Sequence, residues 1–256
     1  MSTLIVPSRF CGPPVSGNGG WTAGELAAHV EHGCPTDHAR AWPPVRVRLR
    51  QPPPLDVTMT VTEVDGTTTL SHDGGVVAEA VPGLDELTAV TGVDVATARA
   101  AEASYAGATR HPFPTCFSCG PERAADDGLR IFPGEVAPVE GRRRVAATWT
   151  PHPSLAEDYH LYSGGTQRAS LAVTWAALDC VGGWSEDLLG RPMVLGQMTA
   201  RVDRLPEIGQ THVVVGEHRG TEGRKSHTAS TLWSGDGDVL AVAEHVWIAV
   251  DPSRFS

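Results

Sequence analysis

The chain repeats one order of predicted elements, and this internal repeat constrains the fold more than any other feature. In the first half, a Gly-rich turn leads into a helical stretch from about Gly19 to Glu31. Strand-like runs follow, separated by turn signals such as Asp65-Gly66. These runs are Val45–Arg50, Val57–Val64, Thr67–His72 and Val76–Val81.

The second half presents the same order. A helical stretch is predicted from about Gln167 to Cys180, and Gly182-Gly183 suits the C-terminus of this helix. Strand-like runs follow at Val194–Asp203, Thr211–His218, Lys225–Trp233 and Val239–Val250. One helix followed by an antiparallel meander, occurring twice, predicts an α+β fold built from two similar units. Two unrelated α+β halves are the alternative.

The chain of 256 residues is long enough for one or two domains with a substantial core. An Ala-rich stretch, Leu84–Tyr105, predicts a connecting helix, and the Pro/Cys-rich stretch His111–Pro133 predicts irregular chain. Segments near Gly128–Val136 and at Arg143–Trp149 would open the second sheet. The predicted boundaries are 1–83 for the first unit, 84–127 for the connection and 128–256 for the second unit.

The net charge of −10 argues against a nucleic-acid partner or an anionic membrane surface. The densest basic run, Arg142-Arg143-Arg144, is short, and we expect it on a solvated face at the start of a strand. No run approaches ~18 uninterrupted apolar residues, so no transmembrane helix is predicted. The first residues lack the basic region of a signal peptide, and a cytoplasmic location is therefore expected.

The cysteine content favours reduced thiols, because an odd number of cysteines in a chain of this size is not typical of a secreted disulfide framework. Cys116-Phe-Ser-Cys119 is a single CxxC motif. A zinc site would need two further ligands, of which His111 could be one. A tight structural turn is the favoured interpretation, and we expect no cofactor and no tightly bound metal. The five cysteines are Cys11, Cys34, Cys116, Cys119 and Cys180.

Four segments resemble an actinobacterial-type family of double-hotdog proteins of the thioesterase superfamily. They are Phe10–Gly24, His111–Arg123, Trp175–Trp184 and Gly223–Lys225, and the likeness runs from about Arg9 to Pro252. The resemblance implies a double hotdog, in which a curved sheet wraps a long helix in each of two fused units. Glu157–Ser170 departs from the family pattern where substrate would enter, and this leaves the substrate open.

Thioester hydrolysis needs a polarised carbonyl and an aimed water or nucleophile. Unpaired backbone N–H groups at a helix start polarise a carbonyl, and Asn18, Gly19 and Gly20 lie where the first helix should begin. Asp179 lies in an otherwise apolar helix, where burial should raise its pKa toward the range of a general base. The resemblance implies that Asp179 acts with the Gly-lined helix start of the other unit. Simple helix capping and a structural carboxylate are the alternatives.

Further residues are candidates for substrate binding. Trp175 lies one turn before Asp179. The resemblance implies that Arg224 and Lys225 meet the coenzyme A moiety of the substrate, although a solvated hairpin would also explain them. Arg123 is a weaker phosphate candidate, and His160 could pair with Asp179 as in a hotdog dehydratase.

The leading hypothesis is a thioesterase that hydrolyses an acyl-CoA or acyl-carrier-protein thioester. A hydratase or dehydratase acting on an enoyl or β-hydroxyacyl thioester is a second hypothesis, and a non-catalytic acyl-thioester binding protein is a third. The expected partner is a small-molecule acyl thioester or an acyl carrier protein, and the chain could form a homodimer. No convincing phosphate-binding loop, dinucleotide motif or serine nucleophile motif is present.

Overall fold

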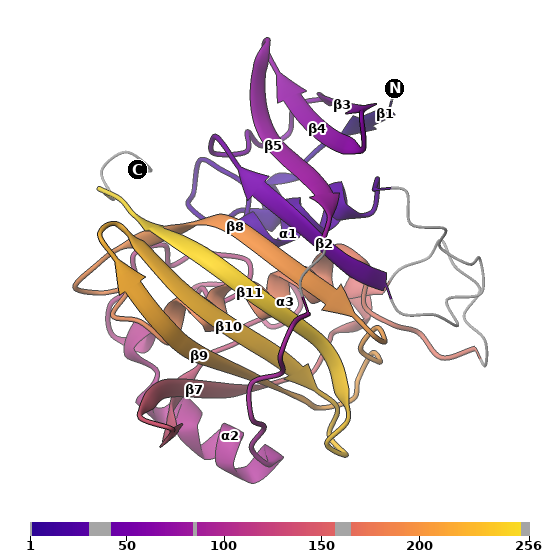
Figure 1. The fold of residues 1–256 in the computed structure, drawn as a ribbon. Helices are drawn as coiled ribbons and strands as arrows, with labels where there is room; N and C mark the ends of the chain where they lie inside the picture. The colour runs from indigo at the N-terminus through magenta and orange to yellow at the C-terminus, as the bar shows by residue number, and fades with distance from the viewer. Residues whose placement is uncertain (1, 31–41, 84–85, 157–164, 252–256) are drawn as a thin grey trace.

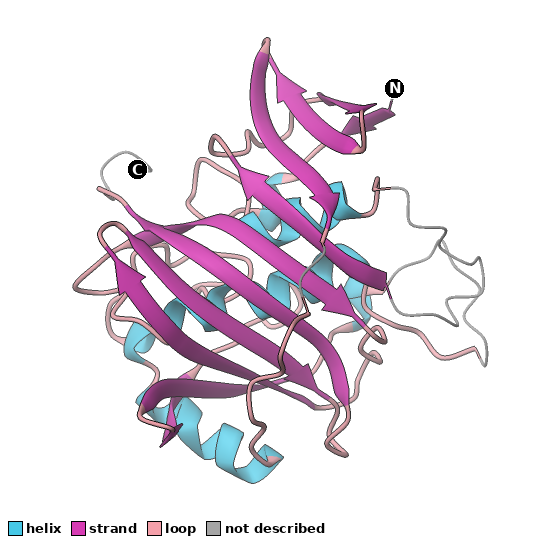
Figure 2. Cartoon of the chain, viewed as in Figure 1, coloured by secondary structure: helices cyan, strands magenta, loops and turns pink. Residues whose placement is uncertain are grey.

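A computed structural model describes residues 2–30, 42–83, 86–156 and 165–251. In this part of the chain, eleven strands form one sheet whose order is β1-β3-β4-β5-β2-β8-β11-β10-β9-β7-β6. All neighbouring strands are antiparallel. Two helices, α1 (Gly19–Ala27) and α3 (Leu171–Trp184), lie against the same face of this sheet (Figures 1 and 2).

Each half of the chain supplies one of these two helices and one set of strands. The first half contributes β1 (Ser2–Leu4), β2 (Trp42–Leu49), β3 (Met59–Val64), β4 (Thr67–His72) and β5 (Gly75–Pro82). The second half contributes β6 (Gly134–Val139), β7 (Arg142–Trp149), β8 (Met193–Val202), β9 (His212–Glu222), β10 (Lys225–Trp233) and β11 (Val239–Ala249). The repeated order of one helix and four strands is therefore confirmed. The first of these strands, β2 or β8, pairs with the last, β5 or β11, so only three strands in each half form a meander.

The two halves join edge to edge through β2 and β8. Val47 lies opposite Met198 and Arg48 opposite Gln197 in this antiparallel pair. The Arg48 Nε also donates a hydrogen bond to Gln197 Oε1 at 2.9 Å. Because each of these strands covers the other's free edge, neither is left to pair with another chain.

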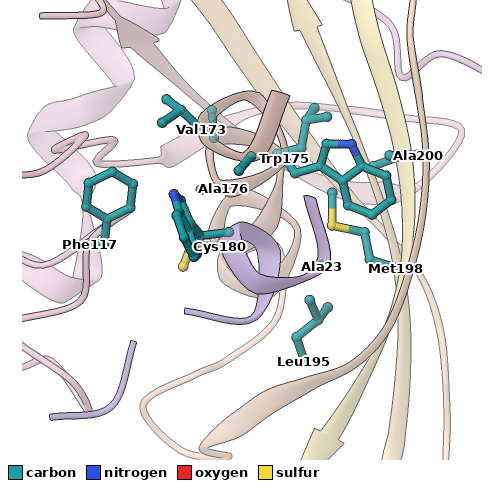
Figure 3. Packing of buried hydrophobic residues seen from close by; sticks show 14 of the residues in the cluster. Ala23, Phe117, Val173, Trp175, Ala176, Cys180, Leu195, Met198 and Ala200 are labelled. Atoms are coloured by element: carbon teal, nitrogen blue, oxygen red, sulfur yellow. The ribbon is translucent and has the colours of Figure 1, made fainter. Parts of the chain in front are cut away.

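The helices α1 and α3 pack closely because glycine stands where they approach. A Cβ on Gly24 would lie 2.6 Å from the Ala172 Cα, and one on Gly20 would lie 2.5 Å from the Asp179 Cβ. All residues of α3 are buried, as expected for a helix that is apolar on every side. Trp175 and Met198 belong to the core beneath the sheet (Figure 3).

The boundaries of α3 differ from the prediction at both ends. The helix starts at Leu171 because the Ser170 hydroxyl accepts a hydrogen bond from the Val173 N–H at 3.2 Å, which is an N-cap contact. It continues through Gly182 and Gly183, which were predicted to end it. A Cβ on Gly182 would lie 2.7 Å from His245 Nδ1, so this glycine allows β10 and β11 to approach the helix.

Three other sequence predictions about local structure need correction. The connecting helix α2 (Val95–Ala101) is shorter than predicted. It begins after Asp94, whose side chain caps the helix by accepting a hydrogen bond from the Thr97 N–H at 2.7 Å. The strand expected near residues 128–136 begins at Gly134. Arg144 is 3% exposed rather than solvated, and its guanidinium donates to the carbonyls of Thr91 and Ala137.

Short 3₁₀ turns complete the described elements. They are η1 (Ser8–Phe10), η2 (Glu102–Ser104), η3 (Ala106–Ala108) and η4 (Pro153–Leu155). The first predicted helix ends at Ala27, and Glu31 lies outside the described residues. Within the described ranges, no helix combines the length and apolar character needed to cross a membrane. The predicted unit boundaries stay a prediction.

Candidate active site

A cavity of about 250 Å³ opens where the two halves of the chain meet. The first half lines it with the start of α1 and the end of β2, and the second half with α3, β8 and β11. Apolar side chains such as Leu195 and Trp247 make up most of the wall. Asn18 and Asp179 are among the few polar groups that line it, and such convergence of polar groups in an apolar pocket is typical of binding sites.

Asp179 of α3 faces the first turn of α1. Its Oδ2 accepts a hydrogen bond from the Gly20 N–H at 2.9 Å, while its Oδ1 is buried and has no hydrogen-bond partner among the described residues. The side chain is 2% exposed. The approach depends on glycine, because any side chain at position 20 would overlap the Asp179 Cβ. The structure thus brings together the two elements that the resemblance paired.

Burial raises the pKa of Asp179 from 3.8 to about 7, because the charged form is poorly solvated there. The nearby Cys116 thiol raises this pKa further, while the hydrogen bond from the Gly20 N–H and the nearby Asn18 amide lower it. A carboxyl group that titrates near neutrality can accept a proton from water and return it during one reaction cycle.

Asn18 is the N-cap of α1. Its Oδ1 accepts a hydrogen bond from the Trp21 N–H at 2.8 Å, and its Nδ2 donates to the Ser118 Oγ at 3.3 Å. Asn18 therefore caps the helix as predicted, and its side chain also lines the cavity.

The first two N–H groups of α1 have different roles. The Gly20 N–H is engaged by Asp179. The Gly19 N–H has no acceptor within the described chain, and Gly19 lines the cavity. A helix start leaves such donors unpaired and partly positive, so Gly19 offers the open position for a carbonyl oxygen.

Two predicted substrate-binding residues have structural roles instead. Trp175 is 2% exposed and does not line the cavity, because its side chain lies in the core with Met198 (Figure 3). Arg123 is held by Asp127 Oδ2 at 2.6 Å, by the Thr115 carbonyl at 2.7 Å and by Cys11 Sγ at 2.9 Å. Its guanidinium fixes the surrounding loop, and Arg123 does not line the cavity.

The predicted coenzyme A contacts do not line this cavity. Arg224 and Lys225 line a neighbouring pocket that shares Ile248 with it. Lys225 pairs with Ile248 across β10 and β11, and Ile248 lines the cavity. The neighbouring Arg224 donates to the Ala249 carbonyl at 3.3 and 3.1 Å from Nε and Nη2. His160 lies outside the described residues.

Two groups of residues around the cavity were not predicted from the sequence. Arg50 and Gln51 line it just after β2, and the Arg50 Nε donates to Glu79 Oε2 at 2.7 Å. Cys180 follows Asp179 in α3, and its Sγ lies 3.7 Å from that of Cys116. The only sequence signal for this contact was a cysteine next to the candidate carboxylate.

The fold resembles that of solved proteins over nearly its whole length. A conserved protein of unknown function with a hot dog fold from Alicyclobacillus acidocaldarius matches with a TM-score of 0.54 at 14% identity, covering 98% of this chain and 93% of the other. A candidate thioesterase from Novosphingobium aromaticivorans matches with a TM-score of 0.56 at 12% identity, covering 97% and 95%. The TesB protein of Mycobacterium avium subspecies paratuberculosis matches with a TM-score of 0.54 at 10% identity, covering 91% and 87%.

No protein-family model and no curated protein matches the sequence. The structural matches are below 25% identity and cover both halves of the chain. Together with one helix and one antiparallel meander in each half, they show that the chain folds as a double hotdog.

Proposed function

We propose that this protein is a thioesterase that hydrolyses an acyl thioester in the cavity beside Asp179. The observation that carries the proposal is the carboxylate of Asp179, held by Gly20 and left with one unpartnered oxygen in a cavity that Gly19 also lines. A buried carboxylate that faces a helix start in an apolar cavity supplies both a proton acceptor and a site for a polarised carbonyl.

The proposed reaction uses these two groups in sequence. The Gly19 N–H donates a hydrogen bond to the thioester carbonyl oxygen, while the Asp179 Oδ1 accepts a proton from a water molecule. The water oxygen adds to the carbonyl carbon and forms a tetrahedral intermediate. Collapse of this intermediate breaks the carbon–sulfur bond, and Asp179 returns its proton to the departing thiolate, so that one acid and one thiol leave.

The substrate is proposed to be an acyl-CoA or an acyl carrier protein, as the resemblance to the actinobacterial-type family implies. The hairpin at Arg224 and Lys225 adjoins the cavity through Ile248, and Arg50 lies at another part of its lining. Cationic side chains beside the cavity suit the phosphates of a coenzyme A arm. The names of two structural matches, a candidate thioesterase and a TesB protein, agree with this class of reaction.

The hydratase or dehydratase alternative has less support. A hotdog dehydratase would need a histidine beside the carboxylate, and no described residue lining the cavity is a histidine. Burying the unpartnered Asp179 oxygen costs free energy, and a non-catalytic binding protein would have no use for this oxygen.

A thiol-release screen tests the proposal. The wild-type protein is incubated with a panel of acyl-CoA esters and acyl carrier proteins, and released thiol is followed with DTNB against a blank without substrate. We expect release for at least one substrate class. Saturable binding without release would support the binding protein, and a change in enoyl absorbance without release would support the hydratase.

A further inference from the structure

Three cysteines meet beside the cavity. Cys116 and Cys119 belong to the loop before β6, and Cys180 belongs to α3. All three are free and buried, and their Sγ atoms lie within 4.8 Å of one another. The CxxC pair alone offers too few ligands for a metal ion, and the fold adds a third thiol from a distant segment.

The spacing of the sulfur atoms suits a metal ion. Two thiolates at ~2.3 Å from zinc and at the tetrahedral angle stand about 3.8 Å apart. The Cys116 and Cys180 sulfurs are 3.7 Å apart. Closely packed neutral thiols can also reach this separation, so the surroundings of the sulfurs have to decide between the two interpretations.

Hydrogen-bond donors point at two of the sulfurs. The Phe113 N–H donates to His111 Nδ1 at 2.9 Å, which places the ring proton on Nε2. This Nε2 lies 3.4 Å from the Cys119 Sγ, so His111 is a donor to the sulfur rather than a metal ligand. The Asn18 Nδ2 is 3.8 Å from the Cys116 Sγ. Donors of this kind stabilise thiolates that bind a metal, whereas packed neutral thiols do not require them.

The loop is built so that its two sulfurs face α3. A Cβ on Gly120 would lie 2.5 Å from the Pro114 carbonyl oxygen and 2.6 Å from the Cys116 N, so only glycine permits this tight turn. The Ser118 hydroxyl between the two cysteines donates to the Ala176 carbonyl of α3 at 2.8 Å. The three sulfurs are thus positioned by packing before any ion binds.

We propose that Cys116, Cys119 and Cys180 bind one zinc ion as thiolates, with the fourth coordination position facing the cavity. Cys116 and Cys180 line the cavity, so a water molecule can complete the tetrahedron from that side. Soft thiolate ligands select zinc over magnesium or calcium. Binding converts three thiols to thiolates and releases three protons, with no change of oxidation state. This proposal differs from the sequence-based expectation that no metal is bound.

The zinc content of the protein tests the proposal independently of enzymatic activity. The full-length protein is loaded with zinc under reducing conditions, freed of excess metal, and analysed by mass spectrometry for zinc per chain. We expect one zinc in the wild type and a loss of at least tenfold in occupancy in Cys119→Ser and Cys180→Ser. Cys11→Ser is the matched control, because Cys11 is also buried and free but bonds to Arg123 outside the three-cysteine cluster.

A second measurement uses the wild-type protein and therefore does not depend on whether the cysteine variants fold. Cobalt replaces zinc in the wild-type protein, and a thiolate-to-cobalt charge-transfer band of three-thiolate intensity with tetrahedral ligand-field bands is expected. A wild-type protein that retains no zinc after loading would overturn the proposal. Equal zinc in Cys119→Ser and the wild type would overturn it too, as would a cobalt spectrum without the thiolate band.

Discussion

Replacing Asp179 with Asn separates the chemical role of this carboxylate from its structural role. Asn has nearly the same size, and its Oδ1 can keep the hydrogen bond from the Gly20 N–H that Asp179 accepts at 2.9 Å. The amide cannot accept a proton from water. Loss of a general base typically lowers the rate by ~10²–10⁴-fold, so we expect thiol release to fall by at least about 100-fold.

The same variant should not lose stability. Burial raises the pKa of Asp179 from 3.8 to about 7, a difference of about three units. Above pH 7 the unfolded chain keeps this carboxyl ionised at no cost, whereas the folded chain must bury the charge, which costs about 4 kcal/mol. The buried amide N–H₂ of Asn costs about 1–3 kcal/mol if it finds no partner. At pH 8 the unfolding free energy of Asp179→Asn should therefore equal or exceed that of the wild type.

The assay combines thiol release with denaturant unfolding at pH 8. Asp73→Asn serves as the control, because the Asp73 side chain is 89% exposed in the turn between β4 and β5. Normal turnover in a folded Asp179→Asn protein would refute the catalytic role. An unfolded variant would show that Asp179 is a structural partner of α1 instead.

Three further outcomes follow from the described contacts. Gly20→Ala should weaken both substrate binding and turnover, because the added Cβ would lie 2.5 Å from the Asp179 Cβ; KM, kcat and the melting temperature would show this. Burial lowers the pKa of His245 to about 4, so between pH 6.5 and pH 4 the unfolded chain binds a proton that the folded chain does not. The unfolding free energy should therefore fall by up to ~3 kcal/mol as the pH is lowered through this range. Urea titrations should show that His245→Gln lacks this pH dependence. The double variant Arg224→Ala/Lys225→Ala should raise KM for acyl-CoA esters several-fold and leave KM for short acyl-pantetheine analogues unchanged. A KM for coenzyme A esters equal to that of the wild type would exclude a phosphate contact.

The sequence predicted the fold well where local signals and tertiary packing agree. The strands Thr67–His72 and Lys225–Trp233 have the predicted bounds, because Gly-containing turns border them in the sequence. The C-terminus of α3 was predicted wrongly, because glycine at a helix end and glycine at a close helix–sheet contact look alike in a sequence. Gly182 makes a close helix–sheet contact, and the residue that it contacts, His245, comes from a distant strand.

The candidate site was predictable only in part for the same reason. Asp179 stood out as a carboxylate in an apolar helix, and Gly20 as part of a helix start. The roles of Trp175 and Arg123 depend on what surrounds them, and an apolar helix does not reveal which of its sides faces a cavity. Cys180 joins a loop 64 residues away along the chain, so no local pattern could have placed it there.

The central claim is that a water molecule activated by Asp179 attacks the thioester carbonyl. A single-turnover reaction in ¹⁸O-labelled water, with the protein in excess over an acyl-CoA that releases thiol, tests it most directly. We predict one ¹⁸O atom in the acid for each thiol released, and no label in the Asp179 side chain. An unlabelled acid, with ¹⁸O appearing in the Asp179 carboxylate instead, would contradict this account.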